Sequence, residues 1–192
     1  MSNTHSQVVV GYDFSHSGAA ALSRAIALAI RAPFHVLHVA CIVDRHGQLP
    51  GHEHHGRVDF AYTERIQRAV IDVIDQELRA AEIVGRVEFY VHVRIGKPAD
   101  ELLDLARDIG ADLIIVGKNG LSGVERLVLG SVSEKVVRDA GCTVEVARLK
   151  SYNYVELSHI VEVAPHHSYV PPHRYTYDDH RAGQRANEWP LY

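Results

Sequence analysis

Short apolar runs alternate with longer segments of helical periodicity along most of the chain, and this alternation limits the possible folds more than any other feature. Strands are predicted over residues 7–12, 34–41, 87–95, 113–116 and 143–149, and helices over residues 17–31, 59–83, 99–109 and 132–140. Such an order is typical of α/β proteins, in which helices cross over between parallel strands. We therefore expect a doubly wound, mostly parallel five-stranded sheet with helices on both faces, in a Rossmann-like arrangement.

A glycine-rich stretch joins the predicted strand 113–116 to the last predicted helix. Gly117, Gly120, Gly130 and Ser131 have the spacing Gly-x2-Gly-x9-Gly-Ser, which is expected by chance in a chain of this length at roughly the per-cent level. These glycines can adopt positive φ and have no Cβ, so their N–H groups can turn toward one anion. Ser131 adds a hydroxyl at a helix N-terminus, where phosphate binds well. The alternative is that the glycines only form turns.

Asp13 follows the first predicted strand directly, at the edge of the sheet where open α/β folds bind their ligands. A different role for Asp13 would be to cap the helix that follows. Ser15 and Ser17 are better placed for that task, since serine at the position before a helix accepts a hydrogen bond from the first turn. We therefore treat Asp13 as a candidate ligand-binding residue.

The glycine motif resembles that of the nucleotide-binding universal stress proteins, and the resemblance covers roughly residues 6–150. It implies that residues 1–150 form an α/β nucleotide-binding domain that often dimerises. Around the first strand the family pattern is Asp-Gly-Ser followed by a second Ser. Asp13 and Ser15 match this pattern, whereas Phe14 and Gly18 depart from it. Because Phe14 is bulkier than glycine, the adenosine pocket should differ in shape.

The resemblance also implies a set of contacts with ATP, ADP or AMP, with or without Mg²⁺. Backbone N–H groups of the glycine stretch would hold the phosphates, Asp13 would hold the ribose or adenine end, and the backbone of Val39 would lie against the adenine ring. Lys118 would neutralise a phosphate or point into water. The predicted cofactor-binding residues are Asp13, Val39, Gly117, Gly120, Gly130, Ser131, Val132 and Ser133.

No set of residues in the sequence indicates a catalytic centre. A Walker A motif is absent, and no paired carboxylates or Ser-His-Asp arrangement stand out. We therefore predict a binding module for stress response or signalling, not an enzyme. The resemblance implies a homodimer through strand 143–149, in which Glu145 and Arg148 would set the register by charge.

Composition argues against several other classes of protein. A net charge of −4 and a pI near 6.4 leave no basic stripe for nucleic acid. No apolar run is long enough for a membrane helix, and Met1–Gln7 is too polar for a signal peptide, so we expect a cytoplasmic protein. Cys41 and Cys142 fit a reducing compartment and lack zinc-site spacing.

Residues 151–192 differ from the rest in being rich in Tyr, His and Pro. So many aromatic side chains suggest an arm that packs on its own domain or on a neighbouring subunit. Two alternatives to the nucleotide hypothesis follow. The arm could link subunits into a higher assembly, which makes the chain a scaffold protein. Histidines of the tail and of the run His52-Glu53-His54-His55 could instead bind a metal, although their spacing is not that of a known metal site.

Overall fold

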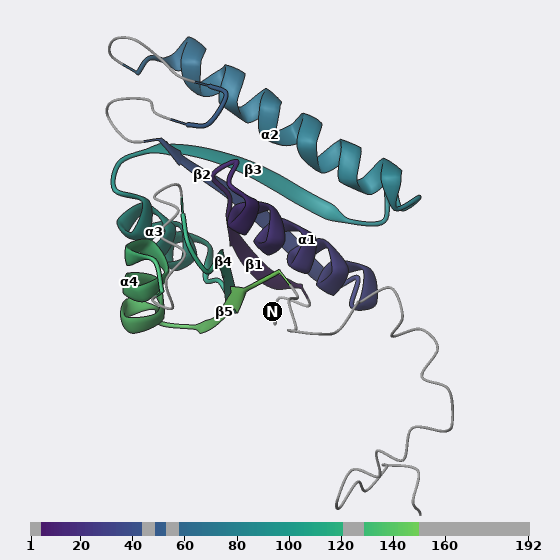
Figure 1. Cartoon of the computed structure of the whole chain (residues 1–192). Helices are drawn as coiled ribbons and strands as arrows, with labels where there is room; N and C mark the ends of the chain where they lie inside the picture. The colour runs from purple at the N-terminus through teal and green to yellow at the C-terminus, as the bar shows by residue number, and fades with distance from the viewer. Residues whose placement is uncertain (1–4, 44–48, 53–57, 121–128, 150–192) are drawn as a thin grey trace, which may run out of the picture. The chain divides into compact units, whose positions relative to one another are not determined.

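A computed structural model of the chain describes residues 5–43, 49–52, 58–120 and 129–149 (Figure 1). The tail 151–192 and residues 53–55 of the histidine run lie outside the described residues, so the hypotheses about them stay untested. Strands and helices alternate from the first element to the last. Their bounds are β1 Ser6–Gly11, α1 His16–Arg31, β2 His35–Val43, α2 Phe60–Ala80, β3 Glu88–Ile95, α3 Pro98–Ile109, β4 Leu113–Gly117, α4 Ser131–Asp139 and β5 Thr143–Ala147.

The described strands form one sheet in the order β3-β2-β1-β4-β5, and every pair of neighbours is parallel. From β1 the chain first adds β2 and β3 on one side and then returns to add β4 and β5 on the other. The strand order therefore reverses between β1 and β4. This is the doubly wound arrangement that the alternation of elements predicts, and the reversal point is where such sheets bind ligands.

Helices cover both faces of the sheet, with α1 and α2 on one side and α3 and α4 on the other (Figure 1). Side chains of β1 alternate between the two layers. Val8 and Val10 join the core under α1 and α2, and Val9 joins the core under α3 and α4. All three are fully buried, which stabilises the fold by about 1.5–3 kcal/mol for each side chain. β1 is therefore buried on both of its faces.

Two side chains that accept hydrogen bonds from backbone N–H groups fix where the first two helices begin. The Ser15 hydroxyl accepts a 3.0 Å hydrogen bond from the N–H of Gly18, and Asp59 accepts a 2.8 Å bond from the N–H of Tyr62. Both residues have extended backbone before the first helical turn. Ser15 is thus the cap of α1, as its position in the sequence predicts.

Several boundaries differ from the predicted ones. β2 continues to Val43, two residues beyond its predicted end at Cys41, because its pairing with β3 runs on to Ile95. α2 ends at Ala80 rather than at Ile83, since Glu82 takes up a left-handed conformation with a φ of 56°. β5 ends at Ala147 rather than at residue 149, where its partner strand β4 also ends.

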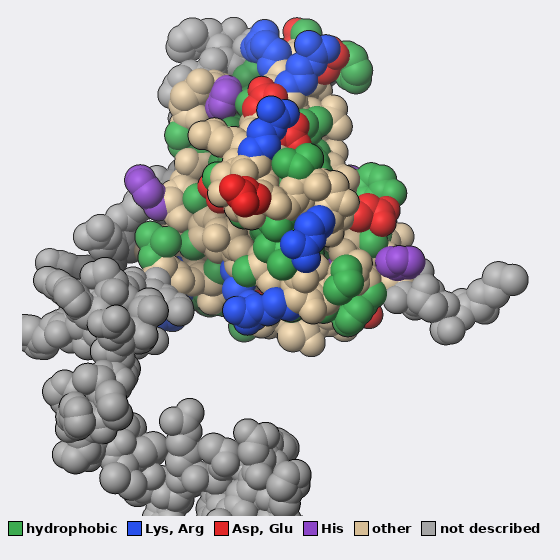
Figure 2. All heavy atoms as spheres, turned by 90° about the vertical axis from the view of Figure 1, so that its right-hand side faces the viewer, with side chains coloured by type: hydrophobic (Ala, Val, Ile, Leu, Met, Phe, Trp, Pro, Cys, Tyr) green, Lys and Arg blue, Asp and Glu red, His purple; other side chains and the backbone are tan. Residues whose placement is uncertain are grey.

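The surface of the described part mixes charges of both signs. On the face shown in Figure 2, basic and acidic side chains lie interspersed among hydrophobic ones and form no broad patch of one sign. A continuous basic stripe, which nucleic-acid binding requires, is therefore missing from this face. No helix in the described ranges combines the length and the apolar character needed to cross a membrane.

Candidate functional site

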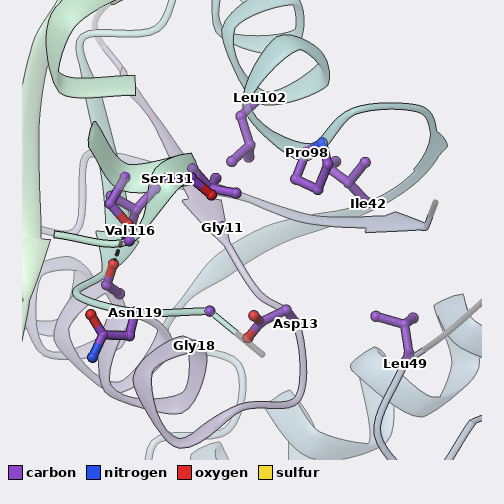
Figure 3. Close-up of a pocket in the computed structure, with 15 residues that line it drawn as sticks. Gly11, Asp13, Gly18, Ile42, Leu49, Pro98, Leu102, Val116, Asn119 and Ser131 are labelled. Atoms are coloured by element: carbon purple, nitrogen blue, oxygen red, sulfur yellow. Dashed lines mark hydrogen bonds between the residues drawn. The ribbon is translucent and has the colours of Figure 1, made fainter. Parts of the chain in front are cut away.

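A cavity of about 280 Å³ lies at the carboxyl ends of β1 and β4, where the strand order reverses. Its walls come from the ends of β1, β2 and β4, from the first turns of α3 and α4, and from the segment 49–52. Figure 3 shows Leu49 at one end of the cavity, Asn119 at the other, and Asp13 between them. The lining residues are Gly11, Asp13, Gly18, Ile42, Leu49, Pro98, Leu102, Val116, Gly117, Asn119, Gly120, Gly130, Ser131, Val132 and Ser133.

The glycine motif is needed for close packing, and not for the positive φ that the sequence suggests. None of Gly117, Gly120 and Gly130 has positive φ in the described structure, so that expectation is wrong. A Cβ at Gly117 would lie 2.5 Å from the carbonyl carbon of Ser17, and one at Gly130 would lie 3.2 Å from the Cα of Asn119. Backbone segments approach each other there more closely than a side chain permits.

One backbone hydrogen bond of Lys118 brings the two ends of the motif together, and a second joins the loop to β5. The Lys118 carbonyl oxygen accepts a 2.9 Å bond from the N–H of Gly130, and the Lys118 N–H donates a 3.1 Å bond to the carbonyl oxygen of Ala147. Residues 121–128 between the two glycines lie outside the described residues. Gly117, Gly120 and Gly130 therefore line one cavity although the last of them is well separated in sequence.

The first turn of α4 faces the cavity without a side-chain cap. Gly130 occupies the capping position and, because it has no side chain, accepts no side-chain hydrogen bond from this turn. Ser131 begins α4, as predicted, and is exposed. The N–H groups of a helix start and the positive end of the helix dipole point toward the same space, which favours an anion there.

Ser133 is buried, and its hydroxyl donates a 2.6 Å hydrogen bond to the carbonyl oxygen of Gly117. This bond ties the start of α4 to the end of β4. Ser133 stays a predicted cofactor-binding residue, but its hydroxyl could donate to a phosphate only by giving up its hydrogen bond to Gly117. The hydroxyl of Ser131 is the better donor on this geometry.

Asp13 stands opposite the glycine motif in a fixed orientation. Its Oδ1 accepts hydrogen bonds from the N–H and the hydroxyl of Ser15, the first at 3.1 Å. A Cβ at Gly18 would lie only 2.5 Å from this Oδ1, so glycine at this departure from the family pattern makes room for the carboxylate. On the other side, a Cβ at Gly120 would lie 3.3 Å from Oδ2. The carboxylate is thus held between α1 and the glycine loop.

Asp13 is the only acidic or basic side chain among the described residues that line the cavity. Two titratable side chains near Asp13, the Tyr12 phenol and the Cys41 thiol, are neutral at physiological pH. Burial, followed by the nearby Cys41, Asp13 and Glu77, raises the pKa of Tyr12 to about 12, and burial followed by Asp13 raises the pKa of Cys41 to about 12. An anionic ligand would therefore be held mainly by backbone N–H groups and not by a lining cation. Lys118 is not among the lining residues.

Apolar side chains form much of the cavity wall, and Ile42, Leu49 and Pro98 lie at the end away from Asn119 (Figure 3). Each of them reads as core or as part of a turn in its own segment, so no local pattern marks it as part of a site. Val39, which is predicted to contact adenine through its backbone, is buried within β2 and does not line the cavity among the described residues. The apolar side chains that do line it are those of Ile42, Leu49, Pro98, Leu102, Val116 and Val132.

Comparisons with known proteins agree with this geometry. The model of the universal stress protein family matches residues 5–148. A relative from Staphylococcus aureus strain USA300 that carries a universal stress protein name is 30% identical over 146 residues, or 76% of this chain and 85% of the relative. Among 31 curated relatives that match significantly, several others carry names of the same kind.

Solved structures show the same fold. A universal stress protein from Lactobacillus plantarum has a TM-score of 0.58 and 24% identity, with 75% of this chain and 98% of that chain covered. A universal stress protein solved in complex with cAMP has a TM-score of 0.50 and 29% identity, with 76% of this chain and 98% of that chain covered.

Proposed function

Since this chain belongs to the universal stress protein family, we propose that it binds an adenine nucleotide in the cavity between β1 and β4 and acts in stress response or signalling. The phosphates would lie against the N–H groups of Gly120, Ser131 and Val132, because the N–H of Gly130 already donates to the carbonyl oxygen of Lys118. Asp13 would accept hydrogen bonds from the ribose hydroxyls, and the base would lie between the apolar side chains at the other end.

One observation carries this proposal. The uncapped first turn of α4, the close-packed glycines and the oriented carboxylate of Asp13 line a single cavity at the reversal point of the sheet. Anion-binding and hydroxyl-binding groups thus line one space, as a nucleoside phosphate requires. A family member at 29% identity was solved with cAMP, which supports a ligand of this class.

The phosphate end does not choose between ATP, ADP and AMP, because each presents a phosphate to the same helix start. We propose ATP as the ligand in the cell, with or without Mg²⁺. Among the described lining residues, Asp13 alone has a carboxylate that could contact the metal, directly or through water. Isothermal titration of the three nucleotides with and without Mg²⁺ ranks them.

We also propose that the chain is a binding module and not a hydrolase. The described lining residues include one carboxylate, which Ser15 already engages, and no histidine or lysine to activate water. Incubation with ATP at stoichiometric protein should therefore release no more ADP than a buffer control. Turnover that disappears in an Asp13→Asn variant would contradict this part of the proposal.

The decisive experiment is to identify the nucleotide in freshly purified protein after denaturation, by chromatography. In a matched pair of variants, Ser131→Ala removes the exposed hydroxyl at the start of α4, whereas Ser131→Thr keeps it. We expect adenine nucleotide in the wild type, weaker retention in the alanine variant by about tenfold in Kd, and retention close to wild type in the threonine variant. Gly130→Val should abolish binding, because even a Cβ there would press on Asn119.

We further propose a homodimer through β5. This strand lies at the edge of the sheet and, within the described residues, pairs only with β4. Leu149 beside it is 67% exposed and Val137 on α4 is 49% exposed. Unpaired edges with apolar neighbours invite pairing with a second chain. Sedimentation velocity should give a dimer for the wild type and a shift toward monomer for Leu149→Asp.

Glu145, which is predicted to set the register of the interface by charge, already has a partner within its own chain. Both Glu145 oxygens are hydrogen-bonded by Arg24 of α1 in the same chain, with a distance of 3.2 Å for the second bond. Glu145 is therefore half-buried against its own helix instead of facing a partner strand. Arg148 is exposed and stays a candidate for charge pairing across the interface.

A further inference from the structure

Phe14 has a backbone conformation that phenylalanine rarely adopts. Its φ is 59°, in the left-handed region that favours glycine, and a bulky side chain is unfavourable there. Such a conformation persists only where the surroundings hold it, and it is found most often at functional sites. The contacts of the ring should therefore indicate what the residue does.

The Phe14 ring lies between two other rings at the mouth of the cavity. Its centroid is 5.0 Å from that of Tyr12, which is buried beneath it, and 4.5 Å from that of His52. Phe14 does not itself line the cavity among the described residues, but the residue before it, Asp13, does. The ring thus joins the end of β1 to the segment that contains His52.

The segment 49–52 is a tight turn with a second anchor. The N–H of His52 donates a 3.0 Å hydrogen bond to the carbonyl oxygen of Leu49, with Pro50 and Gly51 between them and a φ of 72° at Gly51. This sequence and conformation fit a type II turn. The carbonyl oxygen of His52 accepts a 2.7 Å hydrogen bond from the hydroxyl of Tyr62, whose side chain is buried on α2.

The two anchors of the turn, the Phe14 ring and the Tyr62 hydroxyl, together fix the position of Leu49. This side chain is 3% exposed and lines the cavity together with Ile42 and Pro98, which lie across from it in Figure 3. At the apolar end of the cavity, Leu49 is thus the lining residue that belongs to neither a strand nor a helix. Its position depends on the ring of Phe14 and on the hydroxyl of Tyr62.

We propose that Leu49 is a residue that determines base specificity and that Phe14 and Tyr62 are the residues that position it. This inference rests on the proposed nucleotide function and deepens it. The walls around the base would be aliphatic, so polar groups on the edge of the base would find few partners in side chains there. Guanine has a carbonyl, an N–H and an amino group on that edge, whereas adenine has one amino group and a ring nitrogen. The site therefore prefers adenine over guanine.

The test measures Kd values for AMP and GMP by isothermal titration. It uses the full chain, variants of Leu49, which lines the cavity, and variants of Phe14, which positions Leu49. Leu49→Asn places an amide in the wall, and Leu49→Ala removes most of the wall. Phe14→Gly removes the ring that anchors the turn, and Phe14→Tyr restores a ring at the same position. Hydrogen exchange of peptides that contain residues 49–52, measured without nucleotide, reports the anchoring independently of binding.

We expect the wild type to bind AMP at least about tenfold more tightly than GMP. Leu49→Asn should reduce this ratio, and Leu49→Ala should weaken AMP binding by about tenfold. Phe14→Gly should speed exchange over residues 49–52 and reduce the ratio, while Phe14→Tyr should recover both. A residue with a purely structural role would change stability without changing the ratio between the two bases.

Two results would overturn the inference, and only one of them would also overturn the proposed nucleotide function. If the wild type binds AMP but every variant keeps its AMP-to-GMP ratio, Leu49 does not select the base and the proposed nucleotide function stands. If the wild type binds neither nucleotide, the proposed function fails as well. Unchanged exchange over residues 49–52 in Phe14→Gly would overturn the positioning role of Phe14 by itself.

Discussion

Gly117 packs directly against the backbone of Ser17 in the first turn of α1. A Cβ on Gly117 would lie 2.5 Å from the carbonyl carbon of Ser17 and 2.7 Å from its Cβ. The end of β4 and the start of α1 can approach each other this closely because residue 117 has no side chain. The contact holds the glycine loop beside Asp13, so it sets the width of the cavity.

Replacing Gly117 by alanine should destabilise the protein by about 2 kcal/mol or more, because backbone has to move to admit the methyl group. Gly141→Ala is the matched control, since nothing lies within 4 Å of a Cβ there. The free energy of unfolding in urea should fall for Gly117→Ala and stay within about 0.5 kcal/mol of wild type for Gly141→Ala. Equal values for the two variants would contradict the close contact.

Substitutions at Phe14 should separate backbone strain from packing. Phe14→Ala and Phe14→Gly both lose the ring contacts with Tyr12 and His52, but only glycine adopts a φ of 59° without strain. The glycine variant should therefore be more stable than the alanine variant by about 1 kcal/mol. Urea midpoints of the two variants measure this difference. An alanine variant as stable as the glycine variant would show that the backbone relaxes when the ring is removed.

The imidazoles of His38 and His92 should make stability depend on pH. Their rings are joined by a 2.9 Å hydrogen bond, and His38 also bonds to Gln7 at 2.7 Å. Burial lowers the pKa of both, while Glu88 opposes the shift at His38 and His38 and Arg94 add to it at His92. The unfolded chain then binds more protons, so this contribution is complete above a pH of about 6.5 and is lost as the pH falls toward the lowered values.

Urea unfolding at pH 7.5 and at pH 5.5 checks this dependence. The slope is at most about 1.4 kcal/mol per pH unit for each proton taken up on unfolding. The double variant His38→Gln with His92→Gln should lose less stability between the two pH values than the wild type does. His16→Gln, at an exposed position on α1, serves as the control and should keep the wild-type dependence. A double variant that also keeps it would assign the pH effect to other groups.

The ion pair between Arg24 and Glu145 should contribute little to stability. The two side chains are 40% and 32% exposed, and pairs with this much access to water are worth at most about 1 kcal/mol. Glu145→Gln should therefore lower the free energy of unfolding only slightly. The difference from wild type should shrink further in 1 M NaCl, because salt screens exposed charges. A large, salt-independent loss would show that the pair is the main link between α1 and β5.

The sequence predicts the elements that have strong periodicity and the parts of the site that lie close together in the chain. The start of α4 at Ser131 and the position of Asp13 after β1 are examples. The apolar end of the cavity could not be predicted in the same way. Ile42, Leu49 and Pro98 come from three different segments, and each one reads as core or turn by itself. Only the folded chain places them around one space.

The role of individual residues is also harder to predict than their position. The sequence marks Gly117 as important, but it suggests freedom of φ where the structure needs room for Ser17. It marks Phe14 as a departure from the family pattern, but it does not reveal the contact between its ring and His52. Both facts depend on atoms that approach from elsewhere in the chain.

The hydrogen bond between Gly130 and Lys118 has a consequence for protein engineering. It joins two residues, Lys118 and Gly130, that lie on either side of the stretch 121–128. Loop-closure entropy rises slowly with length, by about 0.6 kcal/mol for each doubling. A fluorescent domain or a peptide epitope inserted into this stretch should therefore leave the fold intact. Such a label would be attached close to the proposed phosphate end of the cavity.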